Sequence, residues 1–180
     1  TTTTINLATS LSAVNKKTLL IDADPQGNAS TGIGISYENR SPNLYDLIVN
    51  EALDLNAIKK TIVPGMDIIT SNTNLAASEI ELAEVKNREF VLLNILSKIQ
   101  GYDYILIDCP PALGLLTINA LVASQSIIIP LQSEFFALEG ISSLVNSIEL
   151  IRESFNPNLV IEGILLTMVD KRNSLSSLVE

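Results

Sequence analysis

Histidine and tryptophan are absent from this chain of 180 residues, and it has one cysteine, Cys109. Histidine is the usual general base and zinc ligand, so any catalysis must use carboxylates, lysine, hydroxyl groups or a bound metal. A single cysteine excludes an internal disulfide framework and fits a reducing compartment. Aromatic residues make up only 4% of the chain, so Leu, Ile, Val and Ala must form most of its core.

Basic residues are also few, since 11 Lys and Arg stand against 20 Asp and Glu and give a net charge of −9. This balance argues against a simple basic nucleic-acid binder. No apolar run approaches the roughly 20 residues that a membrane-spanning helix needs, and no signal peptide is visible. We therefore expect a cytoplasmic protein with no membrane contact.

Apolar residues make up 47% of the sequence, enough for a core of ordinary size. Apolar runs typical of buried strands alternate with segments of helical periodicity. Strands are expected at 18–21, 66–70, 104–108, 127–131 and 160–169, and helices at 2–14, 44–49, 53–60, 75–83, 90–99, 113–123 and 138–154. The alternation predicts a single α/β domain, with a mostly parallel sheet and helices on both faces.

Carboxylates follow the ends of several predicted strands. The run 19–21 leads into Asp22 and Asp24, the run 104–107 into Asp108, and the last predicted strand into Asp170. Either Asp22 and Asp24 hold a magnesium ion or orient a water, or they belong to a solvated strand end with a turn-forming Asp-Pro. Because parallel strands end at one edge of the sheet, the acidic residues together favour a phosphate and magnesium site.

A phosphate cradle requires a Gly-rich turn, a lysine and a Ser or Thr at the start of a helix. The chain opens on four threonines at positions 1–4, which fit either a polar helix cap or the helix that follows such a loop. From these residues alone, the polar cap is the better interpretation. Cys109, directly after Asp108, is interpreted as a packing residue rather than a catalytic or iron–sulfur cysteine.

Four blocks resemble the ParA/Soj family of chromosome-partitioning ATPases: TTTTINLA (1–8), LIDADPQGNAS (20–30), YILIDCPP (104–111) and PLQSEFFALEG (130–140). The resemblance implies a P-loop NTPase fold of the deviant Walker type that uses ATP and Mg²⁺. In that family a loop with two lysines lies immediately before the position of Thr1. We therefore expect residues 1–180 to form a single, incomplete ATPase domain that lacks the first strand, its glycine- and lysine-bearing loop and the C-terminal end.

The resemblance implies roles for five residues. Thr1 matches the threonine that coordinates magnesium, and Thr2 matches its phosphate-contacting neighbour. Asp24 matches the catalytic aspartate that positions the attacking water, and Asp22 lies near the metal. Asp108 matches the Walker B aspartate, which holds nucleotide-bound magnesium. Without the lysine-bearing loop, the chain alone is expected to bind ATP poorly and to be inactive.

Two segments match the switches of the family, which respond to the γ-phosphate and bind nucleotide. Gly27 and Asn28 correspond to the first switch, and Pro110 and Pro111 begin the second. Such segments are expected to move between nucleotide states.

The resemblance also implies partners: an ATP-dependent homodimer, nonspecific DNA and a ParB-like protein that stimulates hydrolysis. Lys171 and Arg172 resemble a basic segment near the DNA surface of the family, which implies association with the nucleoid. Two alternatives are a MinD-like division-site ATPase and a biosynthetic P-loop ligase of the cobyrinic acid amidase type, and the block at 134–140 argues against both. A third possibility is that the chain is an inert piece or a binding module.

Overall fold

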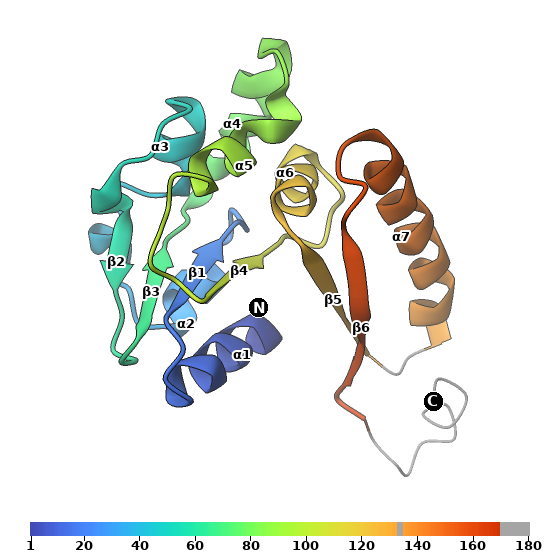
Figure 1. Cartoon of the computed structure of the whole chain (residues 1–180), viewed down its shortest axis with the longest axis horizontal. Coiled ribbons are helices and arrows are strands. Elements are labelled where there is room, and N and C mark those ends of the chain that lie inside the picture. Colours follow the sequence, from blue (N-terminus) through green and yellow to red (C-terminus); the bar gives the residue numbers. More distant parts are fainter. Residues whose placement is uncertain (133–134, 170–180) are drawn as a thin grey trace. The chain divides into compact units, whose positions relative to one another are not determined.

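The structure is a computed structural model that describes residues 1–132 and 135–169, with the backbone alone for 135–139. The chain divides into two compact units, Thr1–Ala123 and Ser124–Glu180, and each is considered by itself (Figure 1). No helix in the described ranges combines the length and the apolarity needed to cross a membrane.

The first unit is built on a four-stranded sheet in the order β2-β3-β1-β4. Its strands are β1 (Thr18–Asp22), β2 (Ile58–Lys60), β3 (Met66–Ile69) and β4 (Tyr104–Asp108). β1 runs parallel to β3 and β4, whereas β2 is antiparallel to β3. All five residues of β1 are buried, as expected for a central parallel strand with both faces covered.

Helices cover both faces of this sheet (Figure 1). The α-helices of the unit are α1 (Thr2–Ala13), α2 (Asn28–Gly32), α3 (Leu44–Val49), α4 (Ser78–Glu81), α5 (Val91–Leu96) and α6 (Leu115–Ala123). Leu19 and Ile21 of β1 pack into one cluster with α3, α5 and α6. Leu20 points to the opposite face and packs with α1 and α2, because side chains alternate along a strand. The predicted α/β architecture is confirmed.

Two of the predicted helices are wrong in detail. Instead of a helix at 53–60, a 3₁₀ turn (Leu55–Ala57) leads into β2, whose residues pair with the edge of β3. The predicted helix at 75–83 is split into a 3₁₀ turn (Thr73–Ala77), the single turn α4 and a further 3₁₀ turn (Leu82–Glu84). In both places packing against neighbouring elements outweighs a weak local helical pattern. Two further 3₁₀ turns lie at Tyr37–Asn39 and Arg88–Phe90.

The second unit contains β5 (Ser126–Gln132), α7 (Phe135–Ser154) and β6 (Val160–Thr167). The two strands are parallel, with a register shift between Ile127 and Ile128. Ile148 and Ile151 of α7 are buried, as is Ile129 of β5. The helix therefore forms the crossover between two parallel strands, as a βαβ unit requires.

Candidate functional site

Two carboxylates are buried side by side at the carboxyl edge of the first sheet. Asp22 ends β1 and Asp108 ends β4, and the two residues are register partners on adjacent parallel strands. Their side chains are almost fully buried, with 0% and 2% of their surface exposed. Buried carboxylates are costly unless they are paired, hydrogen-bonded or metal-bound, so their partners indicate what each one can do.

Asp108 has one bonded and one free carboxylate oxygen. Its Oδ1 accepts a hydrogen bond of 2.9 Å from the Thr4 hydroxyl and lies 3.0 Å from the backbone nitrogen of Thr1. Its Oδ2 is buried, and no donor from the described residues reaches it. A buried oxygen without a hydrogen-bond partner indicates that a group other than these side chains, such as a cation, binds it.

Both oxygens of Asp22, in contrast, are bonded. Oδ1 accepts the amide of Asp24 at 3.3 Å. Oδ2 accepts both the amide and the hydroxyl of Ser30, each at 2.7 Å. The Ser30 hydroxyl in turn accepts the amide of Ser71, at 3.0 Å. Asp22 therefore ties the end of β1 to α2 and, through Ser30, to the segment that follows β3.

Burial raises the pKa of Asp22 above its ordinary value of 3.8, and the neighbouring charge of Asp108 adds to this effect. The two hydrogen bonds from Ser30 act in the opposite direction and lower the pKa. Because the pKa of Asp22 is higher in the folded state than in the unfolded state, the protonated carboxyl contributes its full stability at a pH below the pKa of the unfolded state. This contribution is lost as the pH rises through the pKa of the folded state.

Replacing Ser30 by alanine should therefore destabilise the fold in a pH-dependent way. At a pH above the raised folded-state pKa of Asp22, where the carboxyl is charged in both states, we expect a loss of about 1–3 kcal/mol in the free energy of unfolding. Below pH 3.8, where the carboxyl is protonated in both states, the loss should shrink to about 1 kcal/mol. Urea unfolding at both pH values measures the difference, with Ser10→Ala, which removes an exposed helix bond to Asn6, as the control. An equal loss at both values would contradict the assigned role of Ser30.

Asp24 lies in a tight turn just beyond β1. Its side chain is 8% exposed, and its Oδ1 accepts the amide of Gln26 at 3.0 Å. The turn closes with a bond of 2.9 Å from the Gly27 amide to the Asp24 carbonyl. Gly27 has a φ of +64°, and a Cβ there would collide with the Arg40 guanidinium. Only glycine fits this position without strain, so the turn geometry is fixed by sequence.

The remaining predicted residues lie on the segments around this site. Thr1 caps α1, and Thr2 is its exposed first residue. Asn28 is the exposed first residue of α2. Pro110 and Pro111 lie just beyond β4, after Cys109, in the loop that leads into α6.

The loop after β4 is held at its far end. The Glu79 carboxylate of α4 accepts the Leu116 amide at 3.3 Å, and the Thr117 hydroxyl donates to the Ala112 carbonyl at 2.6 Å. Both contacts lie at the start of α6, where unpaired amides and the helix dipole favour an acidic partner. The proline-bearing loop therefore spans two anchored ends, β4 and α6.

Cys109 packs against the apolar cluster on the α3, α5 and α6 face. Burial, together with a smaller contribution from the charge of Asp108, raises the pKa of its thiol to about 12. A thiol with such a pKa is almost entirely protonated at neutral pH and is a poor nucleophile.

The structure brings together Asp22, Asp24, Asp108, Gly27 and the backbone of Thr1. Sequence reasoning missed Thr4, Ser30 and Arg40, which all bond to these residues or to their turn. The threonine-rich start was a signal for Thr4, but nothing local marked Ser30 or Arg40. Asp170, Lys171 and Arg172 lie outside the described residues.

The atoms at this site fit magnesium rather than a softer metal. Mg²⁺ prefers oxygen ligands and is bound by one or two carboxylates together with water and phosphate oxygens. The free Oδ2 of Asp108 and the nearby hydroxyl groups match that donor set. Among the described residues there is no cluster of three or more His, Cys, Asp or Glu side chains suited to a dedicated metal cage.

A mostly parallel sheet covered on both faces, with buried aspartates and a glycine turn at its carboxyl edge, defines an α/β protein of the P-loop NTPase class. A family model described as an AAA domain matches residues 1–161. The chromosome partitioning protein ParA of Caulobacter vibrioides is 50% identical over 179 residues, which cover 98% of this chain and 67% of that protein. The sporulation initiation inhibitor protein Soj of Bacillus subtilis is 48% identical over 176 residues, which cover 97% of this chain and 70% of that protein. The chain belongs to the ParA/Soj family of chromosome-partitioning ATPases.

Solved structures agree with this fold. Cobyrinic acid a,c-diamide synthase from Mycobacterium smegmatis, with a bound ATP analogue and magnesium, matches with a TM-score of 0.92 at 32% identity. That match covers 99% of this chain and 73% of the other. A plasmid partition protein from Borrelia burgdorferi matches with a TM-score of 0.81 at 27% identity, over 98% of this chain and 76% of the other.

Proposed function

We propose that this chain binds Mg²⁺ and ATP at the carboxyl edge of the first sheet and hydrolyses ATP to drive the partitioning of a chromosome or plasmid. The observation that carries the proposal is the buried, unpartnered Oδ2 of Asp108 beside a second buried carboxylate. The magnesium and ATP named for the mycobacterial structure support the same ligands for this chain.

In this proposal the three carboxylates have different tasks. Asp108 and the hydroxyl of Thr1 hold the metal, which neutralises phosphate charge when bound. Asp24 orients the attacking water from a turn that is fixed by Gly27. Asp22 has no free oxygen and instead fixes the position of α2. Phosphoryl transfer needs positioning and charge stabilisation more than covalent catalysis, so a chain without histidine can perform it.

The phosphate cradle would come from a strand and lysine-bearing loop preceding Thr1, within a single ATPase domain. The exposed edge of the first sheet supports this. β4 is an edge strand of that sheet, and its apolar residues Tyr104 and Ile105 are 47% and 37% exposed. The central strand β1 is fully buried. An apolar, unpaired strand edge is a ready template for a further strand.

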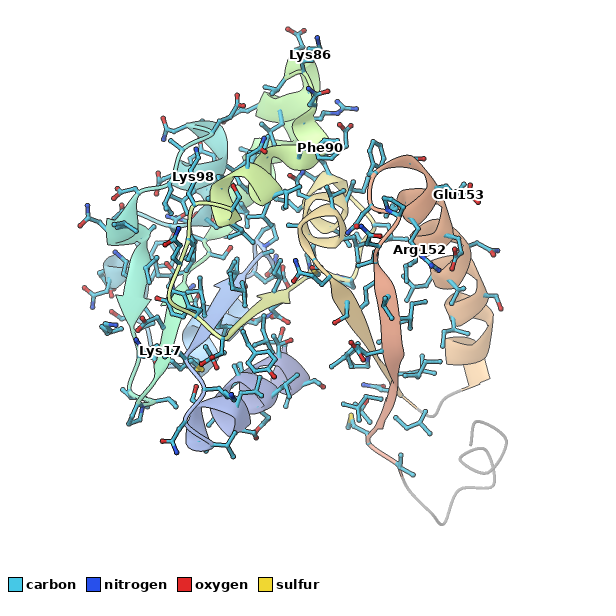
Figure 2. The ribbon with its side chains drawn as sticks, viewed as in Figure 1. Lys17, Lys86, Phe90, Lys98, Arg152 and Glu153 are labelled. Carbon is cyan, nitrogen blue, oxygen red and sulfur yellow. The ribbon has the colours of Figure 1, made fainter. Side chains whose placement is uncertain are left out.

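We further propose that the protein forms an ATP-dependent dimer, binds DNA without sequence preference, and is stimulated by a ParB-like partner, and that the segments at Gly27–Asn28 and Pro110–Pro111 respond to the γ-phosphate. Lys17 and Lys86 lie at opposite ends of the first unit (Figure 2), so these two cations do not belong to one basic patch. Lys171 and Arg172 are the proposed DNA contacts. Such contacts would place the protein in the cytoplasm, on the nucleoid. Binding to phosphates should weaken steeply with salt.

The test is ATP turnover by protein that carries the lysine-bearing loop before Thr1, measured with and without nonspecific DNA and an N-terminal ParB peptide. We expect turnover to rise when DNA and peptide are added together, and ATP to bind far more weakly to residues 1–180 alone. Absence of turnover under every condition would overturn the proposal. Stimulation by anionic lipid instead of DNA would identify a MinD-like ATPase.

The high structural similarity to cobyrinic acid a,c-diamide synthase makes a biosynthetic ligase the second candidate. Its identity of 32% is lower than the 48–50% shared with the ParA and Soj proteins, which favours partitioning. Turnover stimulated by cobyrinic acid and indifferent to DNA would reverse this preference.

A further inference from the structure

Arg40 is a buried cation that forms no close ion pair with any carboxylate of the described residues, although hydrogen bonds and, to a smaller extent, the charge of Arg40 lower the pKa of the nearby, exposed Glu38. Its side chain is 6% exposed, and none of the ion pairs among the described residues includes it. Arginine is rarely buried unless its charge or its five N–H donors are satisfied. The burial of Arg40 therefore implies that its N–H groups are hydrogen-bonded within the protein.

All five donors of Arg40 are used, and they reach neutral oxygens of three separate segments. The bonds run from Nε to the Ile35 carbonyl (3.3 Å), from Nη2 to the Ile35 carbonyl (3.2 Å) and the Thr31 hydroxyl (2.7 Å), and from Nη1 to the carbonyls of Gly27 (3.4 Å) and Ser71 (3.2 Å). The guanidinium thus joins the turn before α2, the loop after α2 and the segment after β3.

The contact with Gly27 connects Arg40 to Asp24. The Gly27 amide closes the Asp24 turn at 2.9 Å, while the Gly27 carbonyl accepts from Arg40. Ser71 is held on both sides, since its carbonyl accepts from Arg40 and its amide donates to Ser30. The planar guanidinium group of Arg40 therefore connects the Asp24 turn to the segment that follows β3.

We propose that Arg40 is a positioning residue for the hydrolysis of ATP, which holds the Asp24 turn in the geometry that orients water. This inference rests on the proposed ATPase function. Arg40 makes no contact with Asp108 or Thr1, so it acts on the water-orienting carboxylate rather than on the metal-binding atoms. Lysine cannot replace it, because a single ammonium group cannot form the hydrogen bonds by which the guanidinium group joins three segments.

The test compares wild type, Arg40→Met, Arg40→Lys and Arg40→Ala in the intact protein with its lysine-bearing loop. A displaced turn should lower kcat by ~10- to 100-fold, as small misplacements of reacting groups do, with the KM for ATP changed by less than about twofold. Arg152→Met is the matched control, because Arg152 lies on α7 of the second unit (Figure 2) and pairs there with Glu149 at 2.7 Å.

A second readout is rescue of Arg40→Ala by free guanidinium ion. Arg40, Pro25, Gln26 and Tyr37 line a cleft of about 500 Å³, which gives the ion access to the vacated position. We expect millimolar guanidinium to restore part of the lost kcat, although it weakens the fold generally.

The outcomes separate the two proposals. Wild-type kcat in Arg40→Met, or full activity in Arg40→Lys, overturns the positioning role while ATP hydrolysis stands. Loss of kcat together with loss of ATP binding and of the folded state, without rescue, also overturns it, since Arg40 would then only stabilise the structure. If the wild type itself does not turn over ATP, the proposed function fails first.

Discussion

Replacing Asp24 by asparagine should lower ATP turnover by ~10²- to 10⁴-fold, the range for removal of a group that assists proton transfer to or from water. Binding of ATP should remain, because the Asp24 carboxylate bonds to the Gln26 amide, whereas the Thr4 hydroxyl bonds to Asp108. Asparagine has the same shape, and its side-chain oxygen can still accept the Gln26 amide that now bonds to Asp24 Oδ1 at 3.0 Å. The turn should therefore keep its geometry while it loses its charge.

Turnover and ATP affinity of the intact Asp24→Asn protein measure this effect. The matched control is Asp54→Asn, since Asp54 caps an exposed 3₁₀ turn by accepting the Asn56 amide at 2.9 Å, a bond that asparagine also makes. Its turnover should equal that of wild type. Wild-type turnover in Asp24→Asn would remove Asp24 from the proposed reaction.

Replacing Asp108 by asparagine should separate stability from function. The unpartnered Oδ2 is the proposed metal-binding atom, so the apparent affinity for ATP in the presence of Mg²⁺ should fall by at least about 10- to 100-fold, the range for loss of groups that merely support a metal ligand. The unliganded fold should be at least as stable as wild type. The charge of Asp108 contributes to the raised pKa of Asp22, so its removal relieves repulsion between buried carboxylates.

Thermal unfolding with and without Mg²⁺ and ATP tests both parts. A ligand that binds the native state raises Tm. In protein that carries the lysine-bearing loop, this rise should be present in wild type and absent in Asp108→Asn. The control Asp103→Asn removes an exposed carboxylate that accepts the Lys17 amide at 2.8 Å at the other end of the sheet, and it should keep the rise in Tm. An unchanged rise in Asp108→Asn would refute the metal-binding role.

The sequence identified the acidic strand ends more reliably than the helices. Runs such as 19–21 and 104–107 are apolar without interruption, which favours strands, and the parallel pairing of β1 with β4 makes Asp22 and Asp108 register partners. Only the first of these strands is fully buried, because Tyr104 and Ile105 of β4 are exposed. The segment 53–60 was wrongly predicted as a helix because its β2 residues depend on hydrogen bonds from β3. Local pattern contains no information about such a distant partner.

By itself the sequence determined the α/β class and the family, and it predicted the residues of the site, because each depends on short-range order: apolar runs, the carboxylates that end them, and the Gly27 turn. Only the tertiary structure distinguished the carboxylates from one another. It showed that both oxygens of Asp22 are occupied and that Oδ2 of Asp108 is free. It also brought Arg40 to the Asp24 turn from thirteen residues beyond Gly27. Burial and hydrogen bonding between segments distant in the chain decide these features, and no local pattern encodes them.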